Sequence, residues 1–441
     1  MSDNEKREAA VFRKVSLRLL PFLFLLYVVN LIDRTNIGMT RLQMVDRQNI
    51  LSEEAYALGA GIFYIGYLFF EVPSNLILLR MGARMWIARI LVSWGLISAA
   101  MMFVSGPWSF GILRVLLGVA EAGFFPGIIY YLSNWFPARV RARAVAHFML
   151  GGVIASMAGN PLSGFLLQFT DQVGGLWGWQ WVFLLEGLPA VALGFVTLAY
   201  LTDRPDQARW LTLAERTWLS QQIENDRGSQ PHSRHSLAAA LGDLRVWLLI
   251  AVYFTAAMGD NSYGFYIPTF LRSQFPDWPP SWIGLLAAVP SVIAMAGMVL
   301  VGRSSDRTGE RRWHVAFSAF IGASGWLMIA LVASGRLAVP GLDSRWLFVA
   351  GAAVTLTGTK CMLPTFWTLP PSFLRGGAAA GGIALINSVA NLGGMLGPTI
   401  IGHVKIASGS FTVGYLILAA VLFLGGLLVL NVTNRIPRPS G

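Results

Sequence analysis

Long apolar segments without a single charged side chain occupy much of this sequence. A helix needs about 20 residues to cross a bilayer, and these segments reach that length. Only 12% of the 441 residues are charged and 55% are hydrophobic, whereas about a quarter of the residues in a soluble protein are charged. The sequence therefore predicts an all-α membrane protein and excludes an ordinary soluble enzyme. The uncharged segments include residues 90–113, 144–170, 278–302, 376–404 and 406–434.

Twelve transmembrane helices are expected, six on each side of one long polar segment. That segment, residues 203–243, is a cytoplasmic linker between an N-terminal bundle (1–202) and a C-terminal bundle (244–441). Its stretch LTLAERTWLSQQIENDR has helical periodicity, so we expect a short helix along the cytoplasmic face, followed by a mobile linker. The twelve spans are expected near 16–37, 55–79, 84–104, 107–133, 144–169, 180–202, 244–271, 281–302, 314–334, 345–372, 376–402 and 411–432.

The net charge of +11 has a distribution that argues against nucleic acid as a partner. Most Lys and Arg residues fall in alternate loops and near the termini, which is the positive-inside pattern with both termini cytoplasmic. Arg41 and Arg47 are among the few assigned to the opposite loops. The single cysteine, Cys361, rules out a disulfide within a monomer and is interpreted as a small buried hydrophobe.

Four charged side chains interrupt the apolar segments: Asp33, Arg34, Arg114 and Glu121. Charges at membrane depth are costly, so they mark a cavity, a partner or a substrate. Arg114 and Glu121 are two helical turns apart on one face, whereas Arg34 points about 100° away from Asp33. An arginine fork suits a carboxylate, and a buried acid suits a proton carrier. The alternatives are a static ion pair that locks helices together and an Arg34 that merely neutralises Asp33.

Two copies of one loop pattern indicate a duplicated six-helix unit. Residues 75–84 match residues 302–312 at an offset of 227 residues (302 − 75). Self-similarity at a fixed offset is the sequence signature of an internal structural repeat. The second copy, GRSSDRTGERR, resembles the loop motif of the major facilitator superfamily, whereas the first copy has Leu79 in place of the usual acid. The ordered motifs DRTNIG, EVPSN, GVAEAGFFPG and WFPARVRARA resemble the anion:cation symporter family, in particular its bacterial tartrate, phthalate and sugar-acid permeases.

This resemblance implies two pseudo-symmetric six-helix bundles and specific roles for several residues. The acids that match Asp33 and Glu121 carry protons in the family, and the residue that matches Arg114 governs the coupling between them. The arginine that matches Arg34 contacts a substrate carboxylate. The family also has a substrate-contacting tyrosine at the position of Tyr67 and a substrate-contacting tryptophan at the position of Trp367.

Lys360 departs from the family pattern. Inside a helix it supplies a second positive charge for a substrate with two carboxylates, or it snorkels to the nearer surface. Asp260 and Asn261 interrupt another apolar segment and either hold Lys360 or bind substrate hydroxyls. Asn387 and Asn391 project the same way with Asn160 as their counterpart across the cavity; these side chains, like Tyr67 and Trp367, have a structural alternative as contacts between helices or at the membrane interface.

The duplicated loop motif supplies the gating candidates. Asp306 and Arg307 follow an expected span, and the motif is expected to hold the two bundles together when the site faces outward. The gating residues are Asp306, Arg307, Arg311, Arg80 and Arg84.

These features together predict a secondary active transporter that imports a small organic anion, hydroxylated or aromatic, with protons by alternating access. No Walker-type glycine loop or metal-ligand spacing is present in the sequence, so we expect neither ATP, nor a metal, nor another cofactor, nor an enzyme. The expected setting is the bacterial inner membrane, with a functional monomer and with protons, the organic anion and lipid as partners. An exporter or facilitator of the same fold and a transporter-like membrane sensor are the alternatives, and sodium coupling stays open.

Overall fold

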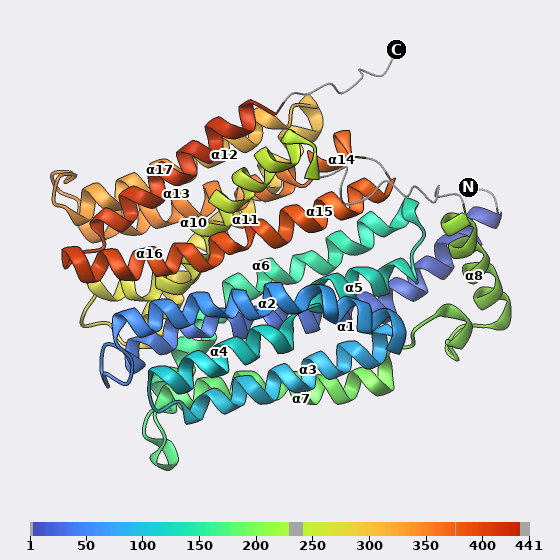
Figure 1. Ribbon diagram of the computed structural model, residues 1–441, viewed down its shortest axis with the longest axis horizontal. Helices are drawn as coiled ribbons and strands as arrows, with labels where there is room; N and C mark the ends of the chain where they lie inside the picture. Colours follow the sequence, from blue (N-terminus) through green and yellow to red (C-terminus); the bar gives the residue numbers. More distant parts are fainter. Residues whose placement is uncertain (1–2, 229–240, 375, 433–441) are drawn as a thin grey trace.

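Helices make up nearly all of the computed structural model, which describes residues 3–228, 241–374 and 376–432 (Figure 1). In this described part, ten helices are long and apolar enough to cross a membrane. The expectation of an all-α membrane protein is therefore confirmed. The β-structure in the described residues is one isolated bridge between Val339 and Leu342.

The first half of the chain forms one bundle of helices, in blue to green in the lower part of Figure 1. Its packed pairs are α3 with α7, α1 with α6 and α2 with α4. The elements of this half are α1 (Asp3–Met44), α2 (Glu53–Met81), α3 (Ala83–Ala100), a 3₁₀ turn η1 (Met101–Phe103), α4 (Pro107–Glu121), α5 (Phe124–Ser133), α6 (Ala138–Phe169), η2 (Val173–Gly175) and α7 (Gly178–Tyr200).

The second half forms the other bundle, in yellow to red in the upper part of Figure 1. Here α12 packs on α13 and on α17, and α10 packs on α16 and α17. Its elements are α10 (Leu244–Gln274), α11 (Pro280–Thr308), α12 (Arg312–Ala333), α13 (Ser344–Phe366), α14 (Pro370–Phe373), α15 (Gly376–Ala390), α16 (Leu392–Ser408) and α17 (Thr412–Leu430).

The two bundles meet mainly where α6 packs on α11, α2 on α16 and α1 on α10. Small residues let the backbones touch there. A Cβ added to Gly284 of α11 would lie 2.3 Å from the carbonyl oxygen of Asn160 on α6, so this position requires glycine. The contact lies toward the end of the bundles opposite the start of α1, which we call the distal end.

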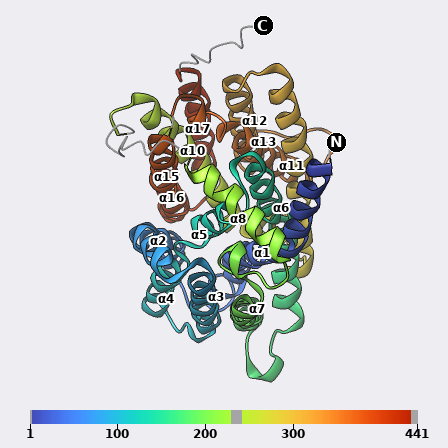
Figure 2. The ribbon, with the colours of Figure 1, turned by 90° about the vertical axis from the view of Figure 1, so that its right-hand side faces the viewer.

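A short helix between the two bundles was expected, and α8 (Leu213–Gly228) supplies it after the 3₁₀ turn η3 (Pro205–Gln207). It crosses the end of the first bundle where α1 begins (Figure 2). Lys14 of α1 pairs with Glu215 at 2.9 Å, and Arg141 of α6 pairs with Asp226 at 3.0 Å. The expected mobile linker falls largely on residues 229–240, outside the described residues.

The helix boundaries correct several predicted spans. The first helix runs over Asp3–Met44 rather than 16–37, because its polar start packs on α8, where Phe12 meets Trp218 with ring centroids 5.5 Å apart. The span predicted at 107–133 is divided into α4 and α5, and the span at 376–402 into α15 and α16. The span predicted at 345–372 ends as a helix at Phe366 and continues into the short α14.

Candidate functional site

An ion pair between α1 and α4 lies at the centre of the first bundle. Arg34 donates from Nε to Oε1 of Glu121 at 2.7 Å, and the Asn30 amide donates to the same oxygen. Glu121 is 1% exposed, whereas Arg34 is 29% exposed. The other carboxylate oxygen of Glu121 is buried without a hydrogen-bond partner among the described residues. The acid is thus held almost entirely by one arginine and one amide.

Glu121 owes its position to a break between α4 and α5. It is the last residue of α4, after which Ala122 is extended and Gly123 takes a left-handed conformation with a φ of +87°. Ser74 of α2 donates to the carbonyl of Ala122 at 2.7 Å. A carboxylate at a helix C-terminus is disfavoured by the helix dipole, so Glu121 depends on Arg34 for compensation.

Asp33, the neighbour of Arg34 in the chain, faces α3 instead. It accepts hydrogen bonds from the Trp94 indole at 2.6 Å, from the Ser98 hydroxyl and from the Asn36 amide at 3.2 Å. Its side chain is buried. Asp33 and Arg34 therefore serve different partners, as their 100° separation around the helix predicts, and Arg34 does not neutralise Asp33.

Arg114 anchors α4 to α2 rather than to an acid. It donates to the backbone carbonyls of Gly59 at 3.0 Å and Ala60 at 3.2 Å, and its guanidinium lies 4.8 Å from the centroid of the Phe63 ring. Arg114 and Glu121 form no ion pair in the described part of the chain, because two helical turns separate them. Glu121 pairs with Arg34 instead.

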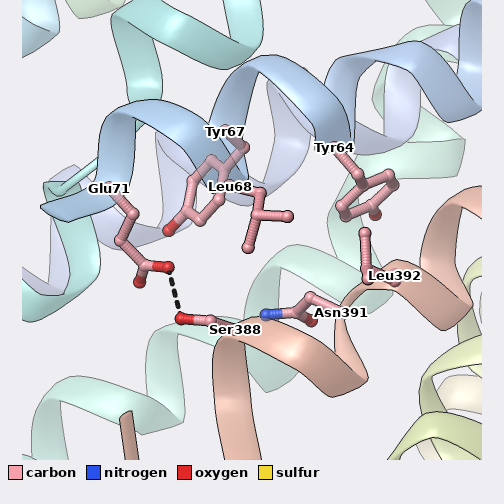
Figure 3. Close-up of a pocket in the computed structure, with 7 residues that line it drawn as sticks. All are labelled: Tyr64, Tyr67, Leu68, Glu71, Ser388, Asn391 and Leu392. Carbon is pink, nitrogen blue, oxygen red and sulfur yellow. Dashed lines mark hydrogen bonds between the residues drawn. The ribbon is translucent and has the colours of Figure 1, made fainter. Parts of the chain in front are cut away.

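A narrow pocket lies between the two bundles, next to the residues that flank Arg34. In Figure 3, side chains of α2 point toward the junction of α15 and α16. Ser388 donates to Glu71 across the pocket at 3.0 Å. The guanidinium of Arg34 lies 5.1 Å from the centroid of the Tyr67 ring, so the ion pair lies next to a residue that lines this pocket. The lining residues are Tyr64, Tyr67, Leu68, Glu71, Ser388, Asn391 and Leu392.

A second ion pair lies inside the other bundle. The Lys360 ammonium on α13 is 2.9 Å from both carboxylate oxygens of Asp260 on α10. The neighbouring Asn261 accepts a hydrogen bond from the Tyr64 hydroxyl, which ties α2 to α10. Of the two interpretations left open for Lys360, the structure thus favours an internal position with Asp260 as its partner over snorkelling.

The remaining substrate candidates are spread over the bundle interface. Trp367 follows α13 and packs against Tyr253, with ring centroids 5.0 Å apart. Asn391 lies at the start of α16 and lines the pocket. Asn387 is half-buried one turn before it. Asn160 is buried against α11, and its Oδ1 atom has no hydrogen-bond partner among the described residues.

Arg41 closes the distal end of the interface. It is fully buried at the end of α1, although the sequence placed it in a loop. Its guanidinium pairs with Asp46 at 3.0 Å and with Glu53, and it donates to Thr269 of α10 at 2.8 Å. The rings of Tyr56 and Tyr266 flank it. The assignment of Arg41 to a loop was wrong because α1 continues one to two turns beyond the apolar segment.

The gating candidates lie at the opposite end of the molecule. Asp306 is 72% exposed and pairs with Arg311 of its own loop at 2.7 Å. Arg307 and Arg80 are exposed. The backbone N–H of Arg84 donates a hydrogen bond to the carboxylate of Asp203 at 2.8 Å. In this conformation, the described contacts of Asp306 thus stay within the second bundle.

Sequence reasoning missed several residues that hold the buried acids. Asn30 precedes Arg34 by four positions, so both share one helix face and reach Glu121 together. Trp94 and Ser98 have the same spacing on α3 and reach Asp33 together. Polar residues four apart in an apolar segment were the signal, but a sequence does not say which acid they face.

Comparison with known proteins agrees with this architecture. A family model described as Major Facilitator Superfamily matches residues 23–398. A protein of Agrobacterium vitis described as a putative tartrate transporter is 44% identical over 98% of this chain and 93% of its own length. A quinolone resistance transporter of Acinetobacter baumannii is 40% identical over 98% of this chain and 96% of its own length. A structure of the xylose transporter XylE from E. coli superposes with a TM-score of 0.74 at 16% identity, covering 95% of this chain and 96% of that one.

The fold, the membrane-length helices and the matched family define a multi-pass membrane transporter, not an enzyme. The chain belongs to the Major Facilitator Superfamily. The resemblance inferred from its motifs is therefore confirmed.

Proposed function

We propose that this transporter imports a small organic anion, a hydroxylated or aromatic carboxylate, together with protons. The observation that carries the proposal is the ion pair between Arg34 and Glu121, in which the arginine borders the pocket and the acid is hidden behind it. A substrate carboxylate that enters the pocket competes with Glu121 for the guanidinium fork.

This competition couples the anion to a proton. Removing one member of a buried ion pair costs about 3–5 kcal/mol, because the other charge is left uncompensated. Protonating an ordinary carboxyl group at pH 7 costs about 4 kcal/mol. The two values are similar, so a proton on Glu121 and an anion on Arg34 stabilise each other. Both then bind on the acidic side of the membrane and leave together on the other.

Other residues have supporting roles in this proposal. Tyr67 and Asn391 line the pocket and contact the substrate in this proposal. Trp367, Asn160 and Asn387 are proposed to contact the substrate as it moves between the bundles. Asp33 remains a proton carrier with neutral donors around it, and Arg114 fixes α4 on α2, so that the coupling acid keeps its position.

The bundles rock about the pocket as rigid units, one from each half of the chain (residues 1–202 and 244–441), with residues 203–243 as the linker. The gating set of Asp306, Arg307, Arg311, Arg80 and Arg84 holds the end near the start of α1 closed when the site opens distally. Both termini are cytoplasmic in this proposal, because of the positive-inside pattern. The protein works as a monomer in the bacterial inner membrane.

Uptake into vesicles tests the function. Purified protein in liposomes should accumulate labelled L-tartrate when the outside is more acidic, without sodium on either side, and collapse of the pH gradient should release it. Arg34→Lys should lose most of this uptake, because an ammonium does not reproduce the two-point fork. Uptake that needs sodium, or that ignores the pH gradient, would contradict proton coupling.

A second candidate is export of a larger organic molecule, which the relatedness to the quinolone resistance transporter favours. The same vesicles separate the two functions. An exporter should expel a fluoroquinolone against its gradient and should leave tartrate unmoved.

A further inference from the structure

The partly buried ion pair in the second bundle has a counterpart in the first. Arg34 and Glu121 join α1 to α4, and Asp260 and Lys360 join α10 to α13. The repeat offset of 227 residues carries Asp33 onto Asp260 (260 − 33) and Arg34 onto Asn261. The same offset carries Glu121 onto Phe348 of α13, so the two ion pairs join corresponding helices without occupying corresponding positions.

Both pairs lie near one residue that lines the pocket, Tyr64. Tyr64, which lines the pocket in Figure 3, lies within electrostatic range of Arg34 and Glu121 on one side and of Asp260 on the other. Its hydroxyl is bonded to Asn261, the residue next to Asp260. Lys360 and Asp260 are 24% and 31% exposed, so both members are more accessible than Glu121, which is 1% exposed.

We propose that the Lys360–Asp260 pair is a second exchangeable ion pair, which receives the second carboxylate of a dicarboxylate substrate and takes up one additional proton on Asp260. This inference rests on the proposed function and extends it to a substrate class. Lys360 leaves Asp260 to bind the second carboxylate, and Asp260 is then an unpaired, partly buried acid. A proton from the solvent neutralises it and departs again when Lys360 returns.

The groups that face Asp260 are compatible with this exchange. Lys360 comes from α13 and Tyr64 from α2, while Tyr253 and Tyr263 lie on α10 itself. Among these neighbours in the described part of the chain, Lys360 is the cation. Asp260 therefore loses the cation named among these neighbours once Lys360 has turned to the substrate.

Proton uptake on binding tests the proposal. L-tartrate and threonate have the same four-carbon hydroxylated chain but two carboxylates and one, respectively. The purified, detergent-solubilised protein is titrated with each acid by calorimetry in two buffers of different ionisation enthalpy, which counts the protons taken up. The wild type should take up one more proton with tartrate than with threonate, and Asp260→Asn should remove that difference.

The double variant Asp260→Asn/Lys360→Met leaves no unpaired charge behind. Its ratio of tartrate to threonate affinity should fall by about a hundredfold, the loss expected for one buried anion contact. The exposed pair Arg345–Asp343, at 2.6 Å on the surface, provides the matched control, and Arg345→Gln/Asp343→Asn should keep the ratio within about twofold.

Two results would overturn the proposal that Lys360 and Asp260 form an exchangeable pair. One is equal proton uptake with both acids in the wild type, and the other is an additional proton that Asp260→Asn still takes up with tartrate. Absence of proton uptake with threonate is a different failure. It would overturn the proposed exchange at Arg34 and Glu121, and with it the inference that depends on that exchange.

Discussion

Arg34 shields Glu121 from the pocket: the acid is 1% exposed and its arginine partner 29% exposed, and 2.7 Å separates Nε from Oε1. In the proposed mechanism, a substrate anion would therefore contact the arginine and not the acid. This choice of contact follows from burial, because Arg34 is the more exposed member of the pair.

Neutralising Glu121 should separate transport from its driving force. Glu121→Gln keeps the shape of the site but has no proton to exchange, so we expect loss of pH-driven accumulation with exchange of labelled for unlabelled tartrate preserved. One pH unit corresponds to about 1.4 kcal/mol per proton, or tenfold accumulation. The wild type should respond to that gradient and the variant should not. Glu224→Gln, at an exposed acid on α8, is the control, and a variant that still accumulates would refute the role.

The distal closure depends on the buried Arg41 cluster. Arg41→Gln removes the cation shared by Asp46, Glu53 and Thr269, which should open this end more often, because a buried pair that loses one member is destabilised by about 3–5 kcal/mol. We expect a cysteine reporter at Ala57, which is buried beside Gly402, to react at least about tenfold faster with an impermeant maleimide applied from the distal side.

That measurement uses a Cys361→Ser background, so that the reporter is the only thiol. Arg47 is the matched control because it is exposed and pairs with Asp171 at the surface at 2.6 Å. Arg47→Gln should leave the labelling rate nearly unchanged. Equal rates in the wild type and Arg41→Gln would show that the cluster does not hold the closure.

Asp171, in the loop between α6 and α7, predicts a pH-dependent contribution to stability. Burial alone would raise the pKa of Asp171, but hydrogen bonds from Arg47, from the backbone N–H of Gly178 and from Gln43 outweigh it and hold the pKa below its ordinary value of 3.8. A carboxyl group with a lowered folded-state pKa stabilises the fold above its unfolded-state pKa and loses that effect as the pH falls through the folded value.

Thermal unfolding at several pH values checks this sign. Asp171→Asn should unfold at a lower temperature than the wild type near pH 7, and the difference should shrink as the pH falls toward and below 3.8. Asp277→Asn changes an exposed loop residue and should show no such trend. A difference that stays constant down to pH 3 would contradict the assignment.

Gly123 permits the break that places Glu121. Its φ is +87°, a conformation that costs an L-residue about 1–2 kcal/mol, and a Cβ there would lie 2.3 Å from Oγ of Ser74. Gly123→Ala should lower the unfolding temperature and also weaken tartrate uptake. Gly111 offers the control on α4, since a Cβ there meets nothing within 4 Å; Gly111→Ala should be neutral or slightly stabilising. Equal effects of both substitutions would argue against strain at the break.

The sequence by itself determined the spans, because a backbone in lipid has to satisfy its hydrogen bonds internally and therefore forms helices wherever twenty apolar residues run together. It also determined that Asp33 and Arg34 diverge, since neighbours on a helix point about 100° apart. The internal repeat and the motifs then identified the family, which the comparisons confirmed.

The tertiary structure decided which groups meet. Helical periodicity placed Arg114 and Glu121 on one face, but only the packing shows that Arg114 binds carbonyls of α2 while Glu121 takes Arg34 from α1. Likewise, it brings Lys360 to Asp260 over 100 residues of chain and buries Arg41. A charge in an apolar segment indicates that a partner exists, because an unpaired charge is too costly there. The choice of partner depends on helix rotation and close approach across the bundles, which no local pattern encodes.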